Sequence, residues 1–233
     1  MQYWRFSMIR EYERIAFLEG EGFGTAYEYA AKEKIVRAFV KGKKRILVYG
    51  LPEKYGFSLN LFLHARISNA ECFLFNANNK KIPAQVRTEM RKMGVKIINS
   101  DFISKKRFDS VMCSEVIQTM SSFALKSLQR IVKGKSFLFF VPNRNNLSHK
   151  KISGLSGLDE QELRKMFGEK TSVSYLDIPF FAPGIKSNKK KQKSIILNVF
   201  AAIGIPVFSF IERFYPQALK KRKAHLVCAL YEK

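Results

Sequence analysis

Short apolar runs recur along the chain and are separated by segments with helical spacing. The runs are rich in Phe, Val, Ile and Leu, which is typical of strands buried on both faces of a parallel sheet. They predict strands at 46–49, 72–75, 95–99, 108–114, 136–141, 173–178 and 225–231. Helical patterns lie between most of them, at 57–67, 83–93, 121–132 and 159–167. This alternation predicts an α/β fold with a doubly wound, mostly parallel sheet of seven strands.

Two segments extend this core. Residues 3–19 and 27–41 have helical spacing, and a glycine cluster at 20–24 separates them. We interpret the cluster as a turn between two N-terminal helices. A phosphate-binding loop is the alternative, but the strand that should precede it is missing. Tyr27 and Phe23 either close over a ligand pocket from these helices or pack in the core.

An insertion precedes the last predicted strand. Residues 179–223 contain lysine runs and an uncharged apolar segment, 194–210, which Gly204 and Pro206 break. This segment either forms a hydrophobic lid or lies on a membrane surface. We expect four parts: an N-terminal helical cap (1–43), the Rossmann-like core (44–178), the insertion (179–223) and the final core strand (224–233).

Residues 44–79 have the plan of a nucleotide-binding β-α-β unit. A buried strand leads into a glycine-bearing turn from Gly50 to Gly56, then a helix, then a strand that ends at Asn76. Backbone N–H groups in such a turn, and at the helix N-terminus, bind phosphate or carboxylate groups. A polar side chain at the tip of the second strand can reach a ribose hydroxyl. The sequence therefore predicts a cofactor site with Gly50, Gly56 and Asn76.

Polar residues also end the fourth and fifth predicted strands. Ser114 and Glu115 follow the fourth strand, and Asn143 follows the fifth. The carboxyl ends of parallel strands meet at one edge of the sheet, where ligands bind. Glu115 is a candidate base or amine-orienting group, with a solvated loop acid as the alternative. Asn143 either orients an acceptor or belongs to a Pro-Asn turn.

Composition narrows the class of protein. The 233 residues are 46% hydrophobic, with 21 Phe, which is enough for a sizeable core. The net charge of +23 favours anionic partners such as RNA, anionic lipid or small anions, although lysine-rich solubility explains it equally well. Three cysteines lack a C-x-x-C pair and predict buried thiols in a reducing cytoplasm. Three scattered histidines predict no metal site. The first residues lack a signal-peptide pattern, so we expect a cytoplasmic protein, with peripheral membrane contact left open.

Residues 108–143 read FDSVMCSEVIQTMSSFALKSLQRIVKGKSFLFFVPN. This segment resembles the class I, Rossmann-like S-adenosylmethionine-dependent methyltransferases, in particular their type 11 branch. In that family an F-D strand is followed by a helix ending in R-hydrophobic-hydrophobic-K-x-G and by a strand ending in P-N. Here these features are Phe108-Asp109, Arg130 to Gly134, and Pro142-Asn143, with the glycine one place early. The last strand would be the antiparallel seventh strand of that fold.

The resemblance implies a methyltransferase that uses S-adenosylmethionine and acts on a small-molecule or lipid-like acceptor, without a metal. It implies cofactor contacts for Tyr49, Gly50, Gly56, Asn76, Asp101, Phe102 and Ser114, and catalytic roles for Glu115 and Asn143. Tyr49 and Asn76 stand where the family usually carries acids. The alternative is a non-catalytic methyltransferase-like protein that binds RNA or anionic membrane through its basic surface. A Rossmann oxidoreductase is a third option, but it would need a tighter glycine fingerprint.

Overall fold

The structure is a computed structural model, and it describes most of the chain. The described residues are 23–51, 62, 65–66, 68–77, 81–105, 108–146, 157–178 and 195–233. Gly56, most of the predicted helix at 57–67, the predicted helix at 3–19 and the lysine run at 186–193 lie outside them.

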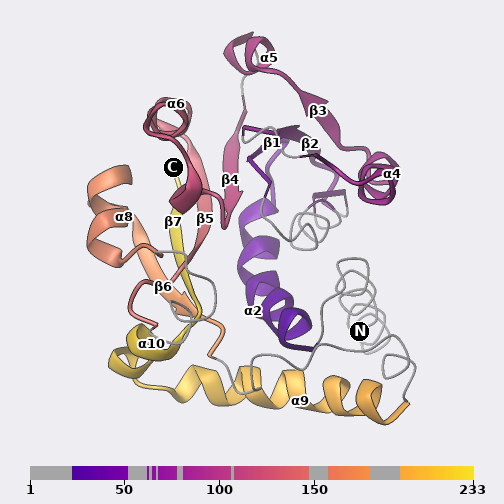
Figure 1. The fold of residues 1–233 in the computed structure, drawn as a ribbon, viewed down its shortest axis with the longest axis vertical. Helices are drawn as coiled ribbons and strands as arrows, with labels where there is room; N and C mark the ends of the chain where they lie inside the picture. Colours follow the sequence, from indigo (N-terminus) through magenta and orange to yellow (C-terminus); the bar gives the residue numbers. More distant parts are fainter. Residues whose placement is uncertain are drawn as a thin grey trace.

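One seven-stranded sheet forms the centre of the protein (Figure 1). Its strands are β1 (Arg45–Tyr49), β2 (Glu71–Phe75), β3 (Lys96–Ile98), β4 (Ser110–Ser114), β5 (Ser136–Pro142), β6 (Ser172–Leu176) and β7 (Leu226–Tyr231). The strand order is β3-β2-β1-β4-β5-β7-β6. β7 pairs antiparallel with both β5 and β6, whereas the other pairs are parallel. The predicted fold class, including an antiparallel last strand, is confirmed.

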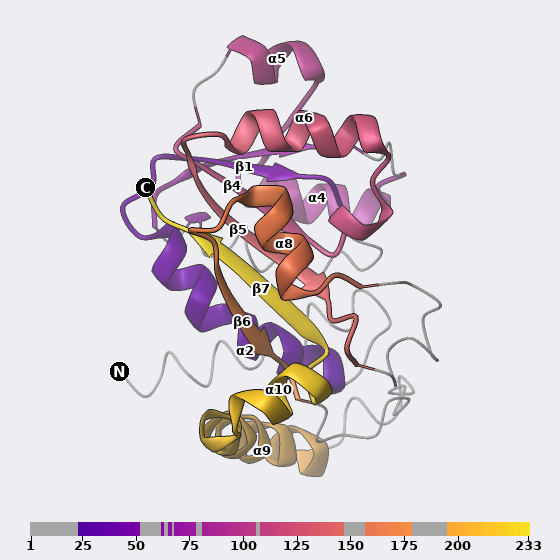
Figure 2. The same ribbon diagram turned by 90° about the vertical axis from the view of Figure 1, so that its left-hand side faces the viewer.

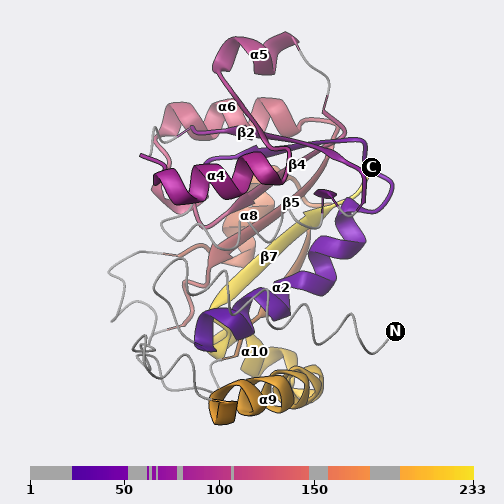
Figure 3. The same cartoon turned by 90° about the vertical axis from the view of Figure 1, so that its right-hand side faces the viewer.

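Helices cover both faces of the sheet. They are α2 (Phe23–Val40), α4 (Ala84–Lys92), α5 (Ser100–Lys105), the 3₁₀ turn η1 (Ile117–Thr119), α6 (Ser122–Val132), α8 (Glu160–Phe167), α9 (Ile195–Phe214) and α10 (Gln217–Lys223). Figure 2 shows α6 and α8 over one face, and Figure 3 shows α2 and α4 over the other. Successive strand residues point to opposite faces. Ile46 and Val48 therefore join the core under α2 and α4, and Leu47 joins the core under α6 and α8.

Local sequence explains where two of these helices begin. Ser121 caps α6 by accepting a hydrogen bond from the Ala124 N–H. Asp159 and Glu162 form a reciprocal capping box at the start of α8, which satisfies two backbone N–H groups that would otherwise lack partners.

Two predictions about helices were wrong, and one helix was not predicted. α2 begins at Phe23, so Gly24 lies inside the helix instead of in a turn before it. α5 was not predicted; the Asn99 side chain accepts a hydrogen bond from the Phe102 N–H at its start. α9 continues through Gly204 and Pro206 as one helix, and the contacts of Glu212 with Tyr27 and of Phe208 with the core offset the one backbone donor missing at the proline.

The helical insertion before β7 is confirmed by α9 and α10. α9 packs along α2, where the Glu212 carboxylate accepts a hydrogen bond from the Tyr27 hydroxyl. In the part of the chain that the structure describes, none of the helices has the length and apolar character that crossing a membrane requires.

Candidate active site

The strand order reverses between β1 and β4, and this crevice is where doubly wound sheets bind ligands. Gly50 ends β1 there with φ +80°, and its N–H donates to the Phe75 carbonyl over 2.8 Å. A Cβ at this position would lie 2.8 Å from Val116 Cγ1. Both the left-handed backbone and the close contact therefore require glycine. The contact joins the end of β1 to the loop after β4.

Tyr49 precedes this glycine and points to the face of the sheet that α6 covers. Its ring is buried 5.3 Å from the ring of Phe75, and its hydroxyl donates to the Ala124 carbonyl of α6 over 3.2 Å. Burial raises the pKa of Tyr49. These contacts give Tyr49 a packing role between β1 and α6, and its contact with a cofactor stays a prediction.

The candidates after β2 and β3 lie at the same edge of the sheet as Gly50, because these strands run parallel to β1. Asn76 is half-buried directly after β2. Asp101 is exposed in the first turn of α5, and the Phe102 ring lies 5.7 Å from the ring of Phe73. The structure thus brings Asn76, Asp101 and Phe102, which were predicted to contact the cofactor, to neighbouring strand ends.

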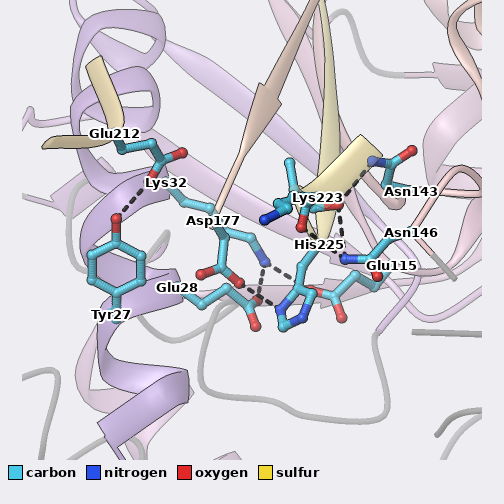
Figure 4. Close-up of polar contacts among 11 residues, drawn as sticks. Tyr27, Glu28, Lys32, Glu115, Asn143, Asn146, Asp177, Glu212, Lys223 and His225 are labelled. Carbon is cyan, nitrogen blue, oxygen red and sulfur yellow. Dashed lines mark hydrogen bonds and ion pairs between the residues drawn. The ribbon is translucent and has the colours of Figure 1, made fainter. Parts of the chain in front are cut away.

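A buried lysine organises the end of β4. Lys32 of α2 has no exposed side-chain surface, and its Nζ donates to Glu115 Oε1 over 2.7 Å and to Glu28 Oε1 (Figure 4). Glu115 has φ +54°, its N–H donates to the Phe140 carbonyl, and Ser114 Oγ lies 3.4 Å from its carboxylate. One ammonium thus serves two carboxylates. Glu115 lies at the predicted strand end, and its carboxylate is paired with Lys32 of α2.

The cluster shifts the pKa values of its members. Burial opposes protonation of Lys32, yet the two carboxylates outweigh it and raise the pKa of Lys32. Burial also raises the pKa of Glu28 to about 7, against the lowering effect of Lys32. Since one ammonium cannot neutralise two carboxylates, Glu28 is the group that takes up a proton near neutral pH.

This assignment predicts a pH effect on stability. The pKa of Glu28 is about 7 when folded and 4.5 as the reference value, so the folded state binds more protons between these values. The free energy of unfolding should therefore fall as pH rises from about 5 to about 7. Glu28→Gln removes this contribution. We expect urea denaturation to show a wild-type-minus-variant difference that declines over this window; parallel stability curves would contradict the assignment.

A second buried pair lies beside the first. His225, just before β7, has its Nδ1 3.1 Å from Asp177 Oδ2, just after β6 (Figure 4). Burial lowers the pKa of His225, but the hydrogen bond and charge of Asp177 outweigh it, and the net pKa is raised. Glu28 and Glu115 also contribute to this rise. The pair therefore extends the charged cluster across the ends of β4, β6 and β7.

Asn143 follows β5 and holds the junction between α10 and β7. Its Nδ2 donates to the carbonyls of Lys221 and Ala224 over 3.0 and 2.8 Å, and its Oδ1 accepts from the Asn145 N–H. Asn146 adds bonds to the carbonyls of Lys223 and Ala224. The observed role of Asn143 is thus structural, and its part in orienting an acceptor stays a prediction.

The loop after β4 carries a buried acceptor that has no partner among the described residues. Gln118 Nε2 donates to the Glu115 carbonyl over 2.8 Å, which fixes the orientation of its amide. Its Oε1 is buried and has no hydrogen-bond partner among the residues that the structure describes. A buried acceptor of this kind calls for a donor. An amine or hydroxyl of a ligand at this edge of the sheet would supply one.

Sequence reasoning missed Lys32, Glu28, Asp177 and His225. One signal for Lys32 was present: it lies three residues after Tyr29 and four before Val36, on the buried side of α2. A charged residue on an apolar helix face indicates a buried partner. Asp177 and His225 flank predicted strands, but only the folded sheet brings them together.

The described residues contain no group of histidine, cysteine or acidic side chains arranged to hold a metal. All three cysteines are buried, reduced thiols, as predicted. A surface depression lined by Lys170, Ser172, Leu230, Tyr231, Glu232 and Lys233 lies at the opposite, amino edge of the sheet. It contains none of the candidate site residues.

Comparisons with known proteins give structural likenesses only. No protein-family model and no curated protein matches the chain. The plantazolicin methyltransferase BpumL, in complex with a triazolic desmethylPZN analog and SAH, is 10% identical over 98% of this chain and 96% of its own, with a TM-score of 0.46. N,N-8-amino-8-demethyl-D-riboflavin dimethyltransferase (RosA) from Streptomyces davawensis is 11% identical over 64% of this chain and 50% of its own, at TM-score 0.44. The CurJ carbon methyltransferase is 12% identical over 83% of this chain and 50% of its own, with a TM-score of 0.43. At such low identities and TM-scores, the fold assignment rests on the strand order of this chain.

Proposed function

We propose that this protein is an S-adenosylmethionine-dependent methyltransferase that acts on a small-molecule or lipid-like acceptor. The strand order carries the proposal, because β7 lies antiparallel between β5 and β6 as the resemblance to class I methyltransferases predicts. The glycine at the switch point supports it. The finer assignment to the type 11 branch rests on the F-D and R-I-V-K motifs of residues 108–134.

The residues at the crevice fit the proposed cofactor. Asn76 would bind the ribose hydroxyls, and Asp101 and Phe102 would contact the adenine. Gly50 and Gly56 would form the turn beneath the cofactor, although Gly56 lies outside the described residues. Gln118 Oε1 supports the fit, since it is a buried acceptor on an amide held by the Glu115 carbonyl, and an amino group would supply its donor. The cofactor supplies a methyl group on a positively charged sulfonium. Its placement in line with an acceptor accounts for most of the rate enhancement in such reactions.

The charged cluster suits the acceptor side of the site. Glu115, held by Lys32, and His225, held by Asp177, lie at the carboxyl edge beyond Ser114. In our proposal these side chains bind the acceptor and orient its nucleophilic atom. Burial lowers the pKa of His225, but Asp177 outweighs it and the net pKa is raised, which favours a protonated imidazole that can donate a hydrogen bond to the acceptor.

Asn76→Asp tests the cofactor assignment by a gain of affinity. A carboxylate accepts hydrogen bonds from ribose hydroxyls more strongly than a neutral amide, by about 1–2 kcal/mol. We expect S-adenosylhomocysteine to bind about tenfold more tightly to the variant in isothermal titration calorimetry.

Asn69→Asp is the matched control, because it makes the same charge change in the turn before β2, at the opposite end of the strand. Its affinity should equal that of the wild type. If Asn76→Asp binds S-adenosylhomocysteine as tightly as the wild type or more weakly, Asn76 does not contact the ribose. The alternative function, a non-catalytic protein that binds RNA or anionic membrane, predicts no binding in any of the three proteins.

A further inference from the structure

An apolar stripe runs along the exposed side of α9. Its members are Ile203, Val207, Phe210, Ile211 and Phe214, which we call the α9 stripe. Phe210 is 57% exposed and Phe214 is 71% exposed, with their ring centroids 4.9 Å apart. The spacing of three and four residues places all five side chains within an arc of roughly 100° on the helix. Large apolar side chains gathered in this way on a surface indicate an interaction site.

Packing fixes the direction of the stripe. Glu212 lies on the opposite side of α9 and is buried against α2, where it accepts the hydrogen bond from Tyr27. Phe208 packs against the core cluster beneath α2. Since these contacts hold the rotation of α9, the stripe points away from the body of the protein.

Basic residues lie on the helix that follows α9. Lys221, Arg222 and Lys223 are exposed on α10, which begins three residues after α9 ends; we call them the α10 basic cluster. Bonds from Asn143 and Asn146 to backbone carbonyls of α10 hold this helix in place. In all three views α9 and α10 lie together at one end of the molecule (Figures 1 to 3).

We propose that the α9 stripe and the α10 basic cluster dock on the surface of an anionic lipid bilayer. An exposed apolar helix face beside a cationic cluster is the arrangement that binds this interface, with apolar side chains among the acyl chains and cations at the headgroups. α9 would lie on the bilayer, since it lacks the character of a spanning helix. The inference goes beyond the proposed function, because it needs neither cofactor nor catalysis.

Charge selects a bilayer over two other occupants. A second copy of this chain would bring together two molecules of net charge +23. RNA would contact the α10 basic cluster but would leave the aliphatic members of the α9 stripe, Ile203, Val207 and Ile211, in water. Anionic lipid complements both the charge and the apolar side chains.

Vesicle flotation tests the proposal on the whole 233-residue chain. We expect binding to vesicles that contain about one third phosphatidylserine in phosphatidylcholine, and little binding to phosphatidylcholine alone. Lys221, Arg222 and Lys223 changed together to Gln should weaken binding about 100-fold, at about 1 kcal/mol for each charge. Phe210→Ser with Phe214→Ser should weaken it at least about tenfold.

α6 offers matched controls at the other end of the molecule (Figure 1). Phe123 is 81% exposed on α6, and Lys126, Arg130 and Lys133 are exposed along this helix and at its C-cap. Phe123→Ser, and the three α6 charges changed to Gln, should leave vesicle binding unchanged. Loss of binding in the α6 charge variant equal to that in the α10 variant would overturn the proposal in favour of general electrostatic adsorption.

A site-specific probe keeps the proposal testable if a double variant folds poorly. The three native cysteines are buried, so a cysteine introduced at Phe214 can be labelled selectively with an environment-sensitive fluorophore. We expect a blue shift on anionic vesicles for Phe214→Cys and none for Phe123→Cys. No shift at position 214 would overturn the proposal. A shift on protein self-association or on RNA, but not on vesicles, would overturn it in favour of those partners.

Discussion

Replacing Lys32 with Met should lower the free energy of unfolding by about 3 kcal/mol at pH 7. The substitution keeps the length of the side chain but removes the ammonium that Glu28 and Glu115 share. Breaking a buried ion pair leaves charges without compensation, and these carboxylates are only 20% and 26% exposed. Protonation can relieve that cost. The deficit should therefore shrink as pH falls to about 5, which urea denaturation at the two pH values would measure.

Arg37→Met is the matched control on the same helix. Arg37 pairs with Glu33 one turn away, but its side chain is 60% exposed, so solvent screens the pair. Its loss should cost less than about 0.5 kcal/mol. A Lys32→Met variant as stable as Arg37→Met would show that the buried cluster contributes nothing to the fold.

Gly50→Ala should cost about 2–4 kcal/mol. A left-handed backbone costs a non-glycine residue about 1–2 kcal/mol, and the new Cβ would lie 2.8 Å from Val116 Cγ1. Gly94→Ala isolates the backbone cost, because Gly94 has φ +74° and no atom within 4 Å of an added Cβ. That control should lose only about 1 kcal/mol.

A double-mutant cycle separates the two causes at Gly50. Val116→Ala removes the methyl groups that the new Cβ would strike, so the two substitutions together should cost at least about 1 kcal/mol less than their sum. Chemical denaturation of the four proteins measures this coupling. Equal losses in Gly50→Ala and Gly94→Ala, with no coupling to Val116, would rule out a steric requirement at the crevice.

The sheet was predictable because its physical cause is local. A strand buried on both faces consists mostly of apolar residues, so a run such as 136–141 can be recognised as a strand from the sequence alone. The continuity of α9 was not predictable from Gly204 and Pro206, because it depends on contacts with α2 that the local sequence does not contain. α5 was not predicted because its six residues are too few to show a helical pattern of apolar positions.

The site was only partly predictable for the same reason. Strand-end residues such as Gly50 and Glu115 follow from the pattern of runs and turns. The need for glycine at position 50 depends on Val116, and the environment of Glu115 depends on Lys32, far away in the sequence. The pair formed by Asp177 and His225 arises only because β7 inserts beside β6. Tertiary contacts of this kind leave no local signal.

Calorimetric titration of the wild-type protein with S-adenosylhomocysteine tests the central claim most directly. Our account predicts binding of one molecule per chain with a Kd below about 1 mM, which corresponds to about 4 kcal/mol of binding free energy. Adenosine, which offers the ribose and adenine alone, should compete for the same site. The absence of binding heat at millimolar S-adenosylhomocysteine, with the protein shown to be folded, would contradict the assignment of this protein as an S-adenosylmethionine-dependent methyltransferase.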